Sequence, residues 1–478
     1  MATNGEWKEC LVVCKTSQGM ELRGSLLRLT RFSVAFELYN PHVVLRTSEV
    51  LSDFRILAND FTLYSGRAVV SSVVNAGPAL VCEATLNESS WQDVGFSARM
   101  LGDGALAAAF REFLNEWQKL YKVLPEFKTV IADMQTFMAD LRLWLDQIEV
   151  GIRAAPSGDR LQLERDVANA VALEAMPSID SFIERFERIA AGIEPELQPA
   201  HRAYLRRQLH PLVLCSPFAW RAYHKPLGYA GDYEVVNMMV HPAPEGASLF
   251  AKLVNVWLVN QMPAQAHRNR ILRLKERLLQ ESLRALQRGR TLRVLNLGCG
   301  PAAEVEQFLA EPLADHAEFT LWDFNEETLE HTSSVLSEAR RRHGRSTTIQ
   351  IQKKSAHQVL KEGQKPVVVG AGRSYDYIYC AGLFDYLTDR TCRQLMNIFY
   401  DWLAPGGLLL ATNVSDVMNG TRPFRYSMEY LLDWHLIYRD GARVAALAPE
   451  RAPADSVKVN SEDLGVNVFI EVRKPDHV

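Results

Sequence analysis

The sequence has little that would place it in a membrane, outside the cell or on a nucleic acid. No apolar run among the 478 residues reaches the roughly twenty positions that a transmembrane helix needs. The first residues lack the basic and then apolar regions of a secretion signal. The formal net charge of -4 gives no general attraction to nucleic acid. We therefore expect a cytoplasmic protein with no integral membrane segment.

Cysteine is sparse and shows no pattern. The seven cysteines are odd in number, scattered and without the spacing of metal ligands. This distribution argues against a disulfide framework and against a zinc site, so we expect no metal. The hydrophobic fraction of 47% is that of a globular protein, and the length predicts two or three domains.

The first hundred residues read as β structure. Short β-rich runs alternate with turn residues, a pattern typical of a small antiparallel barrel. The expected strands lie near residues 11–14, 22–29, 33–39, 43–46, 61–64, 68–74 and 79–82.

Their order loosely resembles a PilZ domain, whose cyclic-di-GMP site uses an Arg-x-x-x-Arg element and an Asp/Asn-x-Ser-x-x-Gly element. Arg23 and Arg28 lie one residue too far apart for the first element. Ser33 fits the second, but Arg31 and Phe36 replace its acidic or amide residue and its glycine. We expect a barrel that has lost the nucleotide site and contacts the rest of the chain or a partner. A working sensor is the alternative.

A helical period follows the barrel. Met134, Phe137, Met138 and Leu141 recur at spacings of three and four residues. Such a stripe indicates a buried core or the seam of a homodimer.

A glycine turn marks the second half of the chain. The apolar run from Val294 ends at Gly298 and Gly300, and a helical pattern begins at once. Asp323 ends the next expected strand, about twenty residues further on, where an acidic side chain can accept ribose hydroxyls. These residues resemble the class I S-adenosylmethionine-dependent methyltransferases, with Ala302 in place of the third glycine.

Later segments extend the resemblance. Residues 349–357 are similar to the third strand and adenine loop of this family, 375–387 to the fourth strand and its exit, and 403–413 to the Pro-Gly-Gly turn and fifth strand. The resemblance implies S-adenosylmethionine as cofactor and a Rossmann-like α/β domain with a seven-stranded, mostly parallel sheet. The implied cofactor-binding residues are Asn296, Gly298, Gly300, Asp323, Phe324, Ser355, Ala356 and Ala381. One alternative is an NAD-type Rossmann domain. The other is a sheet without a ligand, in which the glycines only shape the turn.

These patterns predict four regions. A PilZ-like antiparallel β-barrel occupies residues 1–104 and a helical connector, able to dimerise, residues 105–200. A helical lid or substrate region then covers residues 201–290, and the α/β methyltransferase domain covers 291–478.

The segment from Phe218 to Asn237 breaks a helix and gathers charged and phenolic side chains. Its Lys-Pro-x-Gly-Tyr-x-Gly-Asp-Tyr motif resembles that of the bacterial extracellular-factor, or 3-hydroxypalmitic acid methyl ester biosynthesis, family. We expect Lys225, His224, Tyr229 and Asp232 to be catalytic. The alternative is an interhelix turn in which Asp232 caps the next helix.

The acceptor decides what these residues would do. A fatty acid carboxylate is ionised at neutral pH and needs a cation to orient it, for which Lys225 and Arg221 are candidates, with Tyr233 as a wall. An amine, hydroxyl or thiol must lose a proton, and His224, Asp232 or Tyr229 would then be the base.

Residues 428–439 resemble the second distinctive segment of that family. Glu429 and Tyr438 are its candidate substrate-binding residues, although a packed helix would also explain the aromatic side chains. The helix expected over 266–293 carries Arg270 among many basic residues, and we expect this basic face to be solvated. Contact of this face with an acidic partner or a membrane surface is the alternative.

The expected function is methyl transfer to a small molecule, with the carboxylate of a 3-hydroxy fatty acid as the leading acceptor. One alternative is an N-, O- or S-methyltransferase of a small amine, hydroxyl or thiol metabolite in natural-product biosynthesis. A second is a cyclic-di-GMP-linked regulatory binding protein. No Asn/Asp-Pro-Pro-Tyr element follows the fourth strand, so we do not expect a nucleic-acid substrate.

Overall fold

The structure is a computed structural model. It describes residues 10–38, 44–58, 61–75, 79–87, 90–91, 107, 110–111, 114–115, 122–363, 374–415 and 424–476. Most of the segment in which the helical connector was expected to begin, up to residue 121, lies outside these ranges. None of the described helices is both long and apolar enough to cross a membrane.

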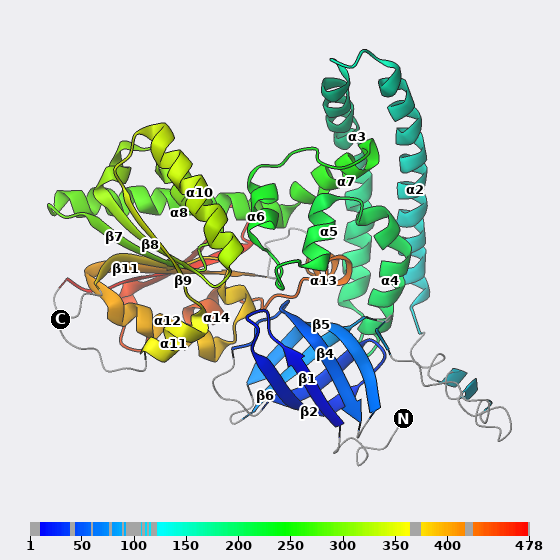
Figure 1. Cartoon of the computed structure of the whole chain (residues 1–478), viewed down its shortest axis with the longest axis horizontal. Helices are drawn as coiled ribbons and strands as arrows, with labels where there is room; N and C mark the ends of the chain where they lie inside the picture. Colours follow the sequence, from blue (N-terminus) through cyan, green and yellow to red (C-terminus); the bar gives the residue numbers. More distant parts are fainter. Residues whose placement is uncertain are drawn as a thin grey trace.

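The first described region is a closed antiparallel barrel (Figure 1). Its strands are β1 Cys10–Lys15, β2 Glu21–Leu29, β3 Ser33–Leu38, β4 Val50–Ala58, β5 Phe61–Asn75 and β6 Leu80–Leu86. They close in the order β1-β2-β3-β6-β5-β4, with alternate apolar side chains such as Val12, Phe36, Phe54 and Cys82 inside. The expected barrel is confirmed.

Two details of the barrel differ from expectation. The segments predicted separately at 61–64 and 68–74 form one long strand, β5. The strand predicted at 43–46 is absent over its described residues 44–46, and β4 begins later, at Val50. Residues 44–49 instead contact the other domains. Val44 packs against the core of the sheet domain, whereas Leu45 packs inside the barrel.

Helices follow the barrel. They are α2 Pro125–Ala154, α3 Arg160–Ala191, α4 Gln198–Val213, α5 Pro217–His224, α6 Tyr233–Val240, α7 Leu249–Val259 and α8 Met262–Gln287. The stripe on α2 buries Phe127, Ile131, Met134 and Met138 against α3 and α4. In Figure 1, α2 and α3 stand side by side as a long hairpin at one end of the molecule.

The C-terminal sheet has seven strands in the order β12-β13-β11-β10-β7-β8-β9. Its parallel strands are β7 Leu292–Leu297, β8 Ala317–Asp323, β9 Thr348–Lys353, β10 Tyr375–Cys380 and β11 Leu403–Val414. β12 Val457–Ser461 and β13 Asn467–Arg473 close one edge with antiparallel pairing. The expected seven-stranded, mostly parallel Rossmann-like sheet is confirmed.

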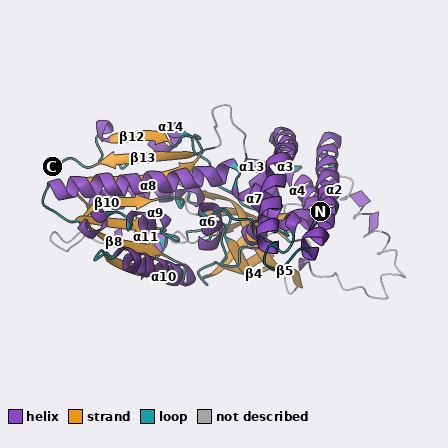
Figure 2. Cartoon of the chain, turned by 90° about the horizontal axis from the view of Figure 1, so that it is seen from above, coloured by secondary structure: helices purple, strands orange, loops and turns teal. Residues whose placement is uncertain are grey.

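Helices cover both faces of this sheet. One face packs against α8, α9 Ala303–Phe308 and α10 Glu326–His343. The other packs against α11 Ala356–Gly363, α12 Asp389–Trp402 and α14 Gly441–Ala445. Figure 2 shows the length of α8 lying along the sheet. The strand order reverses at β7, whose neighbours are β8 and β10, and ligands bind at such switch points in open α/β sheets.

Candidate active site

The glycine turn lies at the carboxyl end of β7. Gly298 and Gly300 have φ values of +72° and +52°, a backbone conformation that favours glycine. The amides of Gly298 and Cys299 donate hydrogen bonds to the carbonyl oxygen of Trp322 on β8, at 2.8 and 3.1 Å. A Cβ atom added at Gly300 would meet nothing within 4 Å. The turn therefore borders open space in which a ligand can approach the backbone.

Asp323 ends β8 beside this turn and is buried. Its carboxylate accepts hydrogen bonds from the amides of Gly300, at 3.2 Å, and Asn325, at 3.0 Å. Burial raises the pKa of Asp323, while these amides and the Arg46 guanidinium oppose the rise. A carboxylate fixed in this way is suited to accept the two hydroxyls of a ribose.

Asn296, the second-last residue of β7, is also buried. Its Nδ2 donates to Glu304 Oε1 at 3.3 Å, and the same oxygen accepts from the Tyr379 hydroxyl at 2.7 Å. The buried Oδ1 atom of Asn296 has no hydrogen-bond partner among the described residues. It is an acceptor ready for a polar ligand group at the centre of the switch point.

One cavity of about 270 Å³ joins these groups. All eight residues predicted to bind the cofactor line it: Asn296, Gly298, Gly300, Asp323, Phe324, Ser355, Ala356 and Ala381. Tyr229 also lines this part, and its ring meets that of Phe324 edge-on with 4.9 Å between centroids. The structure thus brings the predicted set together around one space.

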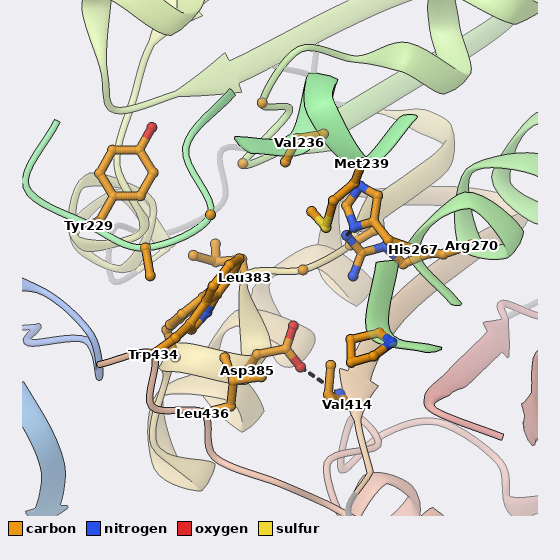
Figure 3. A pocket seen from close by; sticks show the side chains of 18 of the residues that line it. Tyr229, Val236, Met239, His267, Arg270, Leu383, Asp385, Val414, Trp434 and Leu436 are labelled. Atoms are coloured by element: carbon orange, nitrogen blue, oxygen red, sulfur yellow. Dashed lines mark hydrogen bonds between the residues drawn. The ribbon is translucent and has the colours of Figure 1, made fainter. Parts of the chain in front are cut away.

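The rest of the cavity is mainly apolar. Figure 3 shows several of its side chains, and the apolar lining includes Phe218, Val236, Met239, Trp257, Leu258, Ile271, Leu383, Leu431, Trp434 and Leu436. These residues come from α5 to α8, from the loop after β10, and from α13 Arg425–Leu431 and the segment that follows it. An amphipathic acceptor fits such a lining.

Arg270 and Asp385 are charged groups in this apolar part. The Arg270 guanidinium, on α8, bonds to His267 Nδ1 at 2.8 Å and Asn467 Oδ1 at 3.3 Å. Among the described residues, no carboxylate lies within ion-pair distance of it, although burial lowers the pKa of Arg270 and the charge of Asp385 opposes that fall. A Cβ added at Gly382 would stand 2.9 Å from Arg270 Nη2. The cation therefore lies beside the loop after β10, which itself adjoins the glycine turn.

Asp385 lies in the same loop and lines the cavity. One carboxylate oxygen accepts the amide of Val414 at 2.6 Å, the bond drawn in Figure 3. Burial raises the pKa of Asp385, and the Arg270 charge opposes the rise.

Lys225 does not line the cavity. It has a left-handed backbone, with φ +50°, at the end of α5, and its buried Nζ donates to the carbonyl of Leu432 at 3.1 Å. Burial lowers its pKa to about 7. Its described contacts tie α5 to the segment after α13.

Asp232, Arg221 and His224 also lie outside the cavity lining. The Asp232 carboxylate accepts the amides of Glu234 and Val235, so Asp232 caps α6, as the alternative prediction held. Arg221 donates to Asp232 at 2.9 Å. Nδ1 of His224 bonds to the Trp220 carbonyl at 2.8 Å.

Unlike the charged residues of this segment, its two tyrosines, Tyr229 and Tyr233, line the cavity. The Tyr229 hydroxyl bonds to Thr328 Oγ1 at 3.2 Å, and burial raises its pKa far above the ordinary value. The Tyr233 hydroxyl donates to Glu327 at 3.0 Å, and burial raises its pKa to about 12. Both phenols are protonated at neutral pH, so they can donate or pack rather than take a proton.

In the C-terminal segment, Tyr438 lines the cavity and Glu429 does not. Glu429 is buried and accepts from Arg425 at 3.0 Å.

The cavity residues that were not predicted as site residues include three charged ones, Arg46, Arg270 and Asp385. Arg270 was assigned to a solvated basic face because nothing in its spacing separates it from its exposed neighbours. Asp385 lies within the predicted exit of the fourth strand, and this position was the one feature of the sequence that could have identified it.

Comparison with known proteins identifies a methyltransferase domain within the C-terminal sheet domain. A family model described as a methyltransferase domain matches residues 295–409. No curated protein matches the chain. A solved structure described as a "possible exported protein" from Bordetella parapertussis is 18% identical, with a TM-score of 0.40, covering 64% of this chain and 97% of that one.

Two solved methyltransferases are also similar. The methyltransferase SibL is 15% identical with a TM-score of 0.34, covering 72% of this chain and 96% of its own. Magnesium protoporphyrin IX methyltransferase from Synechocystis is 11% identical with a TM-score of 0.30, covering 45% and 87%. On the family match, the chain contains a methyltransferase domain, and S-adenosylmethionine is the cofactor that its glycine turn and acidic strand end fit.

Proposed function

We propose that the chain transfers a methyl group from S-adenosylmethionine to a small-molecule acceptor, and that this acceptor is the carboxylate of a 3-hydroxy fatty acid, giving a methyl ester. The observation that carries the choice of acceptor is Arg270, a cation with no carboxylate within ion-pair distance among the described residues, in an apolar cavity beside the cofactor residues.

The residues around the glycine turn would hold the cofactor. Asp323 would accept the ribose hydroxyls, Phe324 would pack on the adenine, and the free Oδ1 of Asn296 would accept from the methionine part. Bound there, the cofactor supplies a methyl group on a positively charged sulfur. Ser355 and Ala356 would border the adenine.

A carboxylate acceptor needs orientation rather than deprotonation. Arg270 can hold one carboxylate oxygen while the other forms a bond to the methyl carbon and the carbon–sulfur bond breaks, and no proton moves. The apolar lining would take the acyl chain and exclude water. Lys225 and Arg221, first considered for this clamp, are already bonded to Leu432 and Asp232.

A small amine, hydroxyl or thiol acceptor is the second candidate, and Asp385 is the observation in its favour. Its carboxylate lines the same cavity and has a raised pKa, as suits a general base. The test must therefore separate ester formation from transfer to nitrogen, oxygen or sulfur.

We do not favour the cyclic-di-GMP sensor. Arg23 and Arg28 pair with Glu21 and Glu83 on the exposed outside of the barrel, and the ring of Phe36 fills the interior. These pairs occupy the arginines that the resemblance would assign to the nucleotide.

The test is transfer from labelled S-adenosylmethionine to a panel of 3-hydroxy fatty acids, amines, phenols and thiols, with products identified by mass. Methyl ester formation with the acids supports the proposal. Transfer only to amines, phenols or thiols would replace it with the second candidate, and no transfer to any compound would contradict both.

We also propose that the α2–α3 hairpin forms a homodimer. Its large exposed apolar side chains are Leu143, Trp144, Val150, Leu161, Leu163 and Leu173. Light scattering on the wild type and on Trp144→Glu tests this: a dimer that the substitution dissociates is expected, and a monomeric wild type would contradict it.

A further inference from the structure

The barrel reaches into the cofactor part of the cavity. Gln18, Val44, Arg46 and Thr47 line it, all from two loops at one end of the barrel. The Arg46 guanidinium lies over the ring of Phe324, with 4.0 Å from Cζ to the ring centroid, and 5.5 Å from that of Tyr229. Phe324 directly follows Asp323, so a barrel residue covers the acidic end of β8.

Arg46 is held firmly in this position. It is 8% exposed, its backbone amide donates to Glu49 at 3.1 Å, and its Nη2 donates to Ser17 Oγ at 3.1 Å. Ser17 in turn donates to Glu49 at 2.6 Å. This network within the barrel orients the guanidinium before any ligand arrives.

The loop that carries Arg46 is also bonded to the other domains. Thr47 and Val50 donate their amides to the carbonyls of Tyr386 and Gly228, at 3.2 and 2.7 Å. Ser48 Oγ donates to the His435 carbonyl at 2.8 Å and accepts the His435 amide at 2.5 Å. Tyr386 belongs to the loop after β10 and Gly228 to the segment before α6, so the loop joins both sides of the site.

We propose that Arg46 is a cofactor-binding residue and that the barrel forms the outer wall of the S-adenosylmethionine site. This inference rests on the proposed function for the identity of the cofactor. The guanidinium fixes the ring of Phe324 in the plane on which the adenine would stack, and its charge faces the Asp323 carboxylate that would hold the ribose. Cofactor binding and barrel docking therefore stabilise each other.

The chain offers a matched control in Arg67. It also crosses from the barrel, donating to the His224 carbonyl at 2.7 Å and lying 5.9 Å from the ring of Tyr223, yet it does not line the cavity. Replacing either arginine removes contacts between the barrel and the rest of the chain, but of the two only Arg46 faces the cofactor residues.

The experiment measures S-adenosylhomocysteine binding by calorimetry for the wild type, Arg46→Met, Arg46→Lys and Arg67→Met. We expect Arg46→Met to weaken binding about tenfold and Arg46→Lys to recover part of it. Arg67→Met should change it less than about twofold. Equal weakening by Arg46→Met and Arg67→Met, or none by Arg46→Met, overturns the inference, whereas a wild type that does not bind refutes the proposed cofactor itself.

Hydrogen exchange on the wild-type chain gives a second measurement that does not depend on the variants folding. Saturating S-adenosylhomocysteine should slow exchange of the amides of residues 44–50 and leave those of Arg28 and Glu83, on the outside of the barrel, unchanged. Unchanged exchange at 44–50 in a chain that binds the compound would contradict the coupling.

Discussion

The Gly300 amide donates a hydrogen bond to Asp323 at 3.2 Å, joining two parts of the site that lie 23 residues apart in sequence. The bond fixes the carboxylate beside the turn that borders open space. The sheet-domain part of the proposed cofactor site is therefore preformed, and its elements can be tested one at a time.

Asp323→Ala should abolish most cofactor affinity. It removes the acceptor expected to bind two ribose hydroxyls, and charge-assisted hydrogen bonds of this kind contribute about 1.5–3 kcal/mol each. We expect binding of S-adenosylhomocysteine to weaken by about a hundredfold or more in calorimetry. Glu318→Ala, at an exposed position of the same strand, is the control and should bind normally. Normal binding by Asp323→Ala would show that the cofactor binds at a site other than this one.

Gly300→Ala should affect cofactor binding much more than it affects folding stability. The protein has room for the new methyl group, since nothing lies within 4 Å of it, and the positive φ costs about 1–2 kcal/mol. We expect a small fall in the melting temperature and a much larger loss of cofactor affinity. Affinity equal to that of the wild type would show that the ligand does not approach this turn.

Arg270→Gln should raise the KM for a carboxylic acceptor by about tenfold or more, because a charged hydrogen-bond donor is lost. The affinity for S-adenosylhomocysteine should stay within about twofold, since Arg270 lies in the apolar part of the cavity. Arg273→Gln, on the same helix but outside the cavity lining, is the matched control. An unchanged KM in Arg270→Gln would point to the amine, hydroxyl or thiol acceptor.

Lys225 makes stability depend on pH. Burial lowers its pKa from 10.5 to about 7, so the unfolded chain binds more protons between those values. Stability therefore rises as pH increases through that window, by up to about 1.4 kcal/mol per pH unit. Lys225→Met lacks this contribution. The free energy of unfolding of the wild type should therefore rise relative to that of the variant between pH 7 and 10. Parallel profiles in chemical denaturation would contradict the burial of a titrating amine.

The sequence predicted the sheet domain well because its features are local. Glycines at a strand end and an acidic residue at the end of the next strand must meet in a parallel sheet, so Gly298, Gly300 and Asp323 could be placed together from spacing alone. The barrel was predictable from the alternation of its strands, although residues 43–46, most of which belong to the docking segment 44–49, were predicted as a strand.

The acceptor part was harder to predict because its residues meet only through tertiary packing. Lys225 and Asp232 are prominent in sequence, yet they bond to Leu432 and to the start of α6. Arg270 looks like any other arginine on α8, and only the packing of α8 on the sheet brings it to Gly382. The role of Arg46 depends on how the barrel docks, for which the strand pattern holds no signal.

The most direct test of the whole account is a crystal structure of the chain with S-adenosylhomocysteine and a 3-hydroxy fatty acid. We predict ribose hydroxyls within hydrogen-bond distance of Asp323, the adenine against the ring of Phe324 that Arg46 contacts, and the acid's carboxylate on Arg270. A nucleoside bound away from the glycine turn, or an acid whose carboxylate avoids Arg270, would contradict the account.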